Sequence, residues 1–184
     1  MVVALGCMVP LAASCGSSTS STAVKGPVAR GGGPSGAGDR GVADDDTWMT
    51  LATHGARMRV PAGWSYEAKA DSLTAQPNDK KAAIVLTGAA TKADFEAKVR
   101  SIGVDYNVEK VDFGKPKPGK LHGIDVVMYE DMVAVSNGQP ADVFVMLGEA
   151  PNGTGVIVLF IMAWDGTQVH DQNIIDAANS LRPL

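Results

Sequence analysis

Three histidines are the side chains of this 184-residue chain that could bind a metal ion or activate a nucleophile. A zinc site needs ligands at close spacing, such as two histidines at i and i+4, or a cysteine or aspartate companion. His54, His122 and His170 have no such companion, and no Gly-x-Ser-x-Gly or Ser-x-x-Lys motif is present. We therefore expect no catalytic residues, no metal and no cofactor. The alternative is a hydrolase or metal-dependent enzyme that uses loop residues around His54, His122 and Asp165.

The two cysteines lie near the N-terminus, where lipid attachment is the chemistry that their surroundings favour. Residues 2–13 are apolar or small and uncharged, which is the length of a signal-peptide core and too short for a bilayer-spanning helix. The run from Leu11 to Cys15 resembles the bacterial lipobox, in which small residues precede a lipidated cysteine. We expect residues 1–14 to be a lipoprotein signal peptide and Cys15 to be lipidated. Cys7 fits the short pattern too, and the two cysteines could instead belong to a plain secretory leader or form a disulfide.

The segment after Cys15 has the composition of a flexible tether. Residues 15–47 are rich in glycine, serine, proline and threonine and contain no leucine, isoleucine or aromatic residue. Such a segment buries too little apolar surface to offset the entropy lost on ordering. We interpret Asp44, Asp45 and Asp46 as a solvated part of this tether, and we expect a folded domain over 48–184.

Composition excludes two classes of protein. The net charge is −4, and basic residues do not cluster with aromatic ones, so the chain lacks the surface that neutralises phosphates along a nucleic acid. No run of 18 apolar residues exists, so no segment is expected to span a membrane permanently. The membrane partner is therefore expected to be reached only through a lipid anchor.

The domain alternates between strand and helix patterns. Period-two patterns and turn dipeptides predict strands over 57–60, 64–67, 72–76, 82–87, 106–113, 124–135, 142–147 and 155–163. Residues 114–119, rich in proline and glycine, are expected to interrupt this series. Helical periodicity predicts helices over 91–102 and 171–181. The order predicts an α+β fold, an antiparallel β-sheet with two main helices packed on it.

Three short motifs resemble the PsbP-like superfamily. They are Met-Arg-Val-Pro-Ala-Gly-Trp at 58–64, Leu-His-Gly-Ile-Asp at 121–125, and Ile-Ile-Asp-Ala-Ala-Asn-Ser-Leu-Arg-Pro at 174–183. This group includes bacterial envelope lipoproteins of the DcrB kind. The resemblance implies a PsbP-like fold and a binding or adaptor module rather than an enzyme.

Two segments, 143–147 and 156–163, are apolar on both of their faces, so both faces of the sheet must be covered. We expect the two helices to cover one face, and residues 56–90 with the 114–123 loop to cover the other. The alternative is an apolar groove on that second face, with Phe144, Met146 and Trp164 as candidate lining, suited to a lipid tail or an apolar peptide.

These predictions combine into one functional expectation. The chain is expected to be an exported, membrane-anchored lipoprotein of the bacterial cell envelope. Gly16 after the cysteine is compatible with the outer membrane facing the periplasm. Its expected role is that of a non-catalytic binding or adaptor module for an envelope protein or an apolar ligand, and the competing hypothesis is a hydrolase or metal-dependent enzyme of the envelope.

Overall fold

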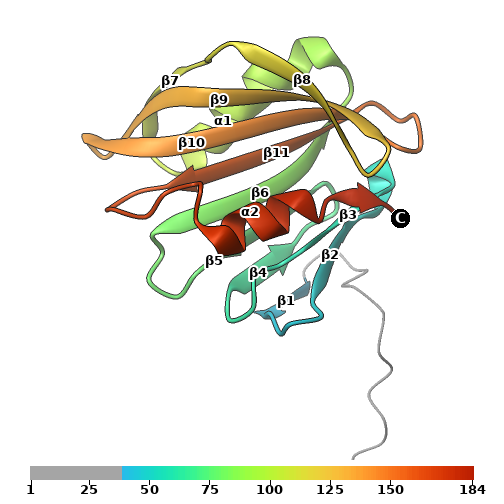
Figure 1. Cartoon of the computed structure of the whole chain (residues 1–184), viewed down its shortest axis with the longest axis horizontal. Helices are drawn as coiled ribbons and strands as arrows, with labels where there is room; N and C mark the ends of the chain where they lie inside the picture. The colour runs from blue at the N-terminus through green and yellow to red at the C-terminus, as the bar shows by residue number, and fades with distance from the viewer. Residues whose placement is uncertain (1–38) are drawn as a thin grey trace, which may run out of the picture. The chain divides into compact units, whose positions relative to one another are not determined.

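The computed structural model describes residues 39–184, without the side chains of Asp39, Glu130, Asp131 and Val133. The expected signal peptide, both cysteines and the tether as far as residue 38 lie outside the described residues. Within the described part the fold is α+β, a mostly antiparallel β architecture with two α-helices, as the sequence predicts (Figure 1).

A large antiparallel sheet forms the body of the described domain. Its strand order is β1 (Asp39–Val42), β4 (Ser65–Ala68), β5 (Ser72–Gln76), β6 (Ala82–Ala89), β11 (Val156–Ala163), β10 (Gln139–Glu149), β9 (Ile124–Ser136) and β7 (Val108–Asp112). Strand β8 (Pro116–Leu121) also pairs with β9, and a small sheet has the order β12 (Arg182–Pro183), β3 (Ala56–Arg59) and β2 (Trp48–Leu51). The helices are α1 (Phe95–Asp105) and α2 (Gln172–Asn179), with short 3-10 turns η1 (Ala52–His54) and η2 (Lys92–Asp94).

Strand β11 is the centre of the core. It lies between β6 and β10, and all eight of its residues are buried. Val158, Phe160 and Met162 face one side of the sheet, while the alternate residues Ile157 and Leu159 face the other. The prediction that this segment is covered on both faces is confirmed.

The two α-helices lie on opposite faces of the sheet, so the expectation that they share a face is wrong. Helix α1 packs Phe95 and Val99 into the cluster that contains Phe160, whereas α2 packs Ile174 and Ala177 into the other cluster. Figure 1 shows α2 in front of the sheet and α1 behind it. Periodicity identifies the apolar stripe of a helix, but it carries no information on which sheet face that stripe meets.

The small sheet covers part of the α2 face. Its inward residues, Met49, Leu51, Ala56 and Met58, are at most 1% exposed and join the cluster that α2 joins. This covering by β3 agrees with the expectation for residues 56–90, but β2 lies outside that range. Because strand residues alternate between faces, the neighbouring residues Trp48, Arg57 and Arg59 face outward.

The described fold begins before Trp48, which corrects the boundary between tether and domain. Strand β1 pairs with β4 from Asp39 to Val42, and Ala43 is buried. The acidic run that follows is an ordered turn, because the backbone N–H of Asp46 and the hydroxyl of Thr47 both donate to the Asp44 carboxylate, at 3.1 and 2.7 Å. These bonds, that of Thr47 first, lower the pKa of Asp44.

The proline-rich segment expected to interrupt the strands is itself strand β8. Pro116 pairs with Tyr129 and Pro118 with Val127 of β9. Residues two apart on an antiparallel strand direct their N–H positions to the same side, and among the described strands β8 pairs only with β9, so an edge strand of this kind can place both missing donors on its unpaired side. Proline is tolerated on an edge strand for this reason. The predicted break is therefore confirmed only at residues 114 and 115, which lie between β7 and β8, and is wrong for residues 116–119.

Candidate functional site

His54 lies against the sheet rather than in an open loop. Its ring sits where Gly88 of β6 leaves room, since a Cβ on Gly88 would lie 1.9 Å from His54 Cε1. Its Nδ1 is 3.0 Å from the hydroxyl of Thr53. Partial burial lowers the pKa of His54, while a hydrogen bond with the Ala89 backbone opposes the shift. The fold therefore favours the neutral ring, which serves as a packing group.

The remaining candidate residues of the enzyme hypothesis are not assembled around His54. His122 Nε2 donates to the carbonyl oxygen of Asn179 at 2.8 Å, at the C-terminal end of α2, whereas exposed His170 precedes the N-terminal end of that helix. Asp165 pairs with Lys81 at 3.0 Å. Lys81, the partner of Asp165, precedes β6, whereas Gly88, which contacts His54, lies near the far end of that strand. At about 3.3 Å per residue, Lys81 and Gly88 are about 23 Å apart.

Within residues 39–184, no group of three or more histidine, cysteine or carboxylate side chains is arranged so that it could hold a metal ion. The three histidines therefore occupy separate places in the described fold. Their types indicated chemistry, but the neighbours that such chemistry needs are supplied only by tertiary structure.

The three residues expected to line one apolar groove lie on two faces of the sheet. Met146 is 3% exposed and belongs to the α2-side cluster, and half-buried Phe144 packs against the same cluster. Trp164 packs against the cluster on the α1 side. The expected groove is therefore wrong in its composition, because Trp164 continues the β11 alternation that points Phe160 and Met162 toward α1.

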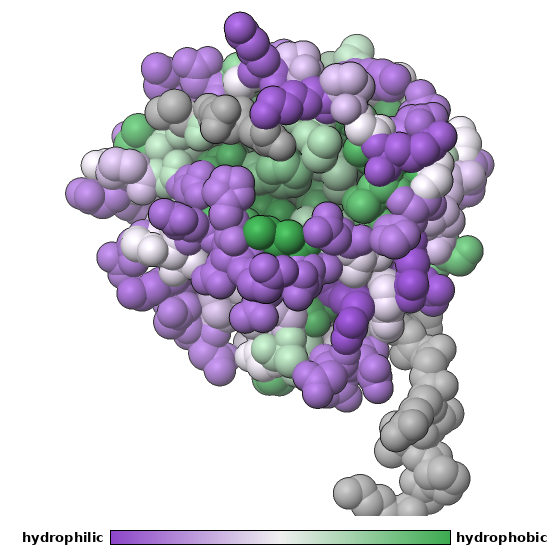
Figure 2. All heavy atoms as spheres, viewed as in Figure 1, coloured by the Kyte–Doolittle hydropathy of each residue, from purple (hydrophilic) through white to green (hydrophobic). Residues whose placement is uncertain are grey.

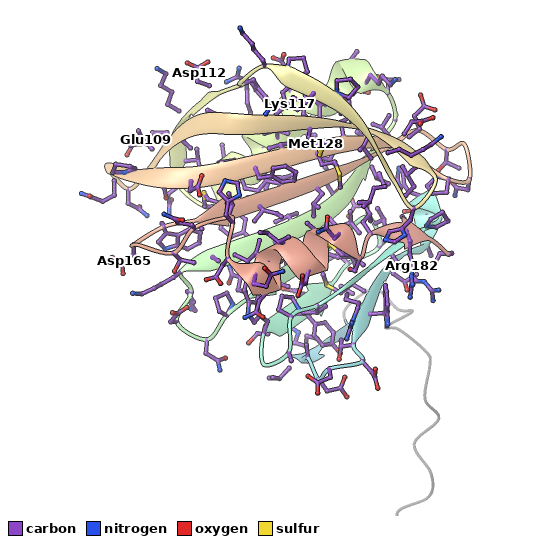
Figure 3. All side chains as sticks on the ribbon, viewed as in Figure 1. Glu109, Asp112, Lys117, Met128, Asp165 and Arg182 are labelled. Carbon is purple, nitrogen blue, oxygen red and sulfur yellow. The ribbon has the colours of Figure 1, made fainter. Side chains whose placement is uncertain are left out.

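The α2 side of the sheet, against which Phe144 packs, carries a hollow that we call the apolar hollow. We assign to it four of the partly buried apolar side chains that pack against the α2-side cluster, namely Leu121, Met128, Phe144 and Ala178. Figure 2 shows a concave apolar area above α2 and over β9 and β10, framed by hydrophilic side chains. Figure 3 shows Met128, one of these residues, between these strands and facing the viewer. The floor includes Met146, which pairs with Met128 across β9 and β10.

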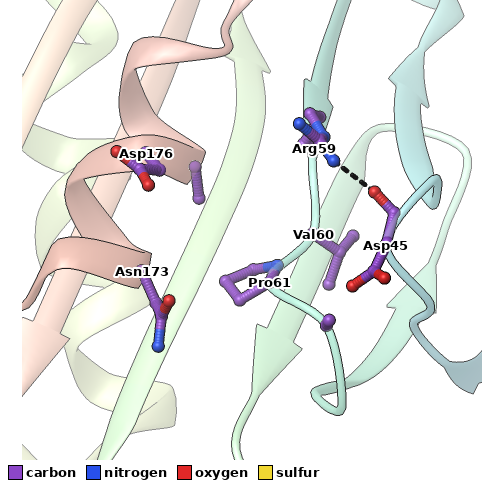
Figure 4. Close-up of a pocket in the computed structure, with 8 residues that line it drawn as sticks. Asp45, Arg59, Val60, Pro61, Asn173 and Asp176 are labelled. Atoms are coloured by element: carbon purple, nitrogen blue, oxygen red, sulfur yellow. Dashed lines mark hydrogen bonds between the residues drawn. The ribbon is translucent and has the colours of Figure 1, made fainter.

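A second depression separates α2 from the connection between β3 and β4. It is lined by Asp45, Arg59, Val60, Pro61, Ala62, Asn173, Asp176 and Ala177. Arg59 Nη2 donates to the backbone oxygen of Asp45, while the Asp45 carboxylate points away from Arg59 (Figure 4). Because its walls carry carboxylates, an amide and a guanidinium, this depression is polar, in contrast to the apolar hollow.

The outward face of the small sheet gathers three arginines around one indole. The guanidinium carbons of Arg182, Arg57 and Arg59 lie 4.0, 5.1 and 6.0 Å from the centre of the Trp48 ring. We call these four residues the arginine face. Sequence analysis missed it, although Trp48, Arg57 and Arg59 fit an outward strand pattern. Arg182 joins them only through the pairing of β12 with β3.

Comparisons with known proteins identify no family for this chain. No family model matches it, and no curated protein matches it. A solved structure from Bacteroides thetaiotaomicron VPI-5482, determined at 1.50 Å resolution, is similar to the chain with a TM-score of 0.44 and 11% sequence identity. The match covers 80% of this chain and 48% of that one, so the chain spans about half the length of that structure. Among the described residues, no helix is both long and apolar enough to cross a membrane.

Proposed function

We propose that this chain is an exported, lipid-anchored binding module of the bacterial cell envelope that holds an apolar ligand in the apolar hollow. The observation that carries the proposal is the hollow itself, where Leu121, Met128, Phe144 and Ala178 remain only partly buried above a buried apolar floor. Concave, mostly apolar surface with a polar rim is typical of small-molecule sites.

The side chains that border the hollow suit a ligand with a flexible hydrocarbon part. Met128 and Met146 are unbranched and polarisable, so they adapt to irregular apolar shapes. Phe144 adds a rigid aromatic wall with a large apolar surface. Hydrophilic side chains frame this area (Figure 2), which favours a ligand whose apolar part enters the hollow while a polar end stays in water.

We also propose that the domain is PsbP-like, of the DcrB kind. The α+β architecture supports this, and the three motifs coincide with turns and with the ends of elements. The first spans the end of β3 and the turn before β4, and the last spans most of α2 and β12. The second forms the β8–β9 turn, where His122 and Gly123 have positive φ angles of 47° and 89°. Each motif thus has a backbone role that the residue types explain.

Lipid attachment at Cys15 is the first testable part of the proposal. Metabolic labelling with an alkyne fatty acid is expected to mark the wild-type protein and to leave Cys15→Ala unmarked, because the thiol is the only acceptor at that position. Equal labelling of the two proteins would move the site to Cys7. An unlabelled wild-type protein would contradict the lipid anchor.

Ligand binding in the apolar hollow is the second testable part. Replacing Phe144 by serine is expected to weaken the binding of a fluorescent long-chain fatty acid about tenfold or more, because the aromatic wall contributes roughly 1.5 to 3 kcal/mol of apolar burial. The measurement is a fluorescence titration on the full chain, with circular dichroism as a check on folding.

The matched control for this experiment is Trp164→Ser. Trp164 is also a half-buried aromatic residue, but it packs on the α1 side. The control is expected to bind the probe like the wild type. An equal loss of affinity in both variants, or in neither, would contradict binding in the apolar hollow.

A further inference from the structure

The arginine face concentrates positive charge in a chain whose net charge is −4. Arg57 and Arg182 are directly opposite each other across β3 and β12, and Arg59 pairs with Trp48 across β3 and β2. Like charges directly opposite each other on neighbouring strands destabilise a sheet. The three guanidinium groups therefore repel one another while they share one indole ring.

Five exposed cations elsewhere in the described domain are each paired with a carboxylate. The pairs are Arg40–Glu67, Lys81–Asp165, Lys92–Glu149, Arg100–Glu96 and Lys120–Asp125, with N–O distances between 3.0 and 3.9 Å. The side chains of Arg57 and Arg182 form no hydrogen bond or ion pair with a described residue, and the described group that both of them contact is the Trp48 ring. Arg59 donates to the backbone oxygen of Asp45 and to no carboxylate among the described side chains.

Burial adds a second observation at the same place. The Nε atoms of Arg57 and Arg182 are both buried and have no hydrogen-bond partner within the described structure. Buried donors in proteins are nearly always satisfied, so an unsatisfied pair calls for a physical explanation. Cation–π contact with Trp48 helps to hold both guanidinium groups in place, because Arg182 and Arg57 lie 4.0 and 5.1 Å from the ring centre. The groups are thus positioned before any anion arrives.

We propose that Trp48, Arg57, Arg59 and Arg182 form a binding site for a phosphate group. A guanidinium presents a planar fork of donors that matches phosphate oxygens in bidentate fashion. A phosphate has enough oxygens to meet more than one fork and enough negative charge to offset the repulsion across β3 and β12. A carboxylate has two oxygens and a single charge, so it satisfies one fork and leaves the other arginines uncompensated.

The site is separate from the apolar hollow. It lies on the outward face of the small sheet, whereas the inward face of that sheet packs against the core. A phosphate group in this position could come from a soluble phosphate ester or from a phospholipid headgroup. The chemistry of recognition is the same in both cases, so two arms of one experiment distinguish the sources.

The first arm is calorimetric titration of the full chain with inorganic phosphate, and with acetate at matched ionic strength. The wild type is expected to bind phosphate and to bind acetate at least about tenfold more weakly. Arg182→Gln is expected to lose about tenfold or more in phosphate affinity, since it removes a charged fork. Arg40→Gln removes an exposed cation elsewhere and is expected to bind phosphate like the wild type.

The second arm is co-sedimentation with vesicles of phosphatidylglycerol or of phosphatidylcholine, in a Cys15→Ala background that carries no lipid on that residue. Sedimentation with phosphatidylglycerol alone, reduced by Arg182→Gln but not by Arg40→Gln, would identify the headgroup as the source. Phosphate binding in the first arm without this vesicle difference would identify a soluble phosphate ester. Both results support the site.

A second variant separates loss of binding from loss of folding. Thermal unfolding without phosphate is expected to give Arg182→Gln a melting temperature close to the wild-type value, because relief of the repulsion with Arg57 offsets the lost contact with the Trp48 ring. Should this variant fail to fold, Arg57→Lys keeps the charge but removes the fork, and it is expected to lose phosphate affinity in the first arm. The proposal would be overturned if a folded Arg182→Gln or Arg57→Lys variant bound phosphate and vesicles as tightly as the protein without that substitution. It would also be overturned if acetate bound as tightly as phosphate.

Discussion

Replacing Ile161 by aspartate is expected to unfold the protein at room temperature. Ile161 is 1% exposed in the central strand β11, where its neighbours in register are Ile84 of β6 and Phe144 of β10. A carboxylate placed there has no polar partner, and burying it costs several kcal/mol. That cost is comparable to the whole stability of a typical domain, about 5 to 15 kcal/mol. Circular dichroism and a thermal scan measure the loss.

Val42→Asp is the matched control, because it introduces the same carboxylate at the surface. Val42 is 67% exposed on β1, at the edge of the large sheet. Surface substitutions of this kind change stability by about 0.5 kcal/mol, so a cooperative transition near the wild-type temperature is expected. A folded Ile161→Asp variant with a similar transition would show that β11 is not enclosed on both faces.

Replacing Gly155 by alanine is expected to cost about 2 to 4 kcal/mol of folding free energy. Its φ angle is 133°, a conformation that side chains rarely adopt, and an added Cβ would lie 2.4 Å from the carbonyl oxygen of Ala89. The clash is with backbone, so rotating a side chain cannot relieve it. The shift would disturb the start of the β6–β11 pairing, where Val156 is opposite Ala89. Urea unfolding at 25 °C measures the change.

Gly153→Ala in the same loop is the control for this prediction. Gly153 also has a positive φ, of 74°, but an added Cβ there meets no atom within 4 Å. Only the conformational cost applies, which is about 1 kcal/mol. If the two variants lost the same stability, the close approach of Gly155 to β6 would be wrong.

The prediction that strand β11 is covered on both faces was the strongest one from the sequence, and it was confirmed for a simple reason. An apolar run with no polar alternation, such as 156–163, can be stable only where both faces are covered. Local pattern therefore determined burial at this position. The prediction for residues 116–119 was wrong for the opposite reason. Two prolines are compatible with a strand only at a sheet edge. Whether a segment lies at an edge depends on strand order, which no local pattern contains.

The candidate sites show the same division. Phe144 and Met146 were correctly placed on one face by their spacing of two, but Trp164 was grouped with them although β11 directs it to the other face. The period-two rule applies within a strand and does not relate side chains on different strands, because that relation depends on register. The alternative of an enzyme site around His54, His122 and Asp165 depends in the same way on contacts between distant segments, and the described fold does not bring these residues together.

The sequence by itself determined the α+β class, the positions of most strands and both helical stripes, because these follow from hydrophobic periodicity and turn chemistry over a few residues. Tertiary structure alone decided that the helices cover opposite faces and that β1 and β8 extend the sheet. It also decided that Arg182 meets Arg57 beside Trp48. Those features depend on contacts between residues far apart in the chain. Their energies come from packing and register, which are properties of the folded arrangement rather than of any local segment.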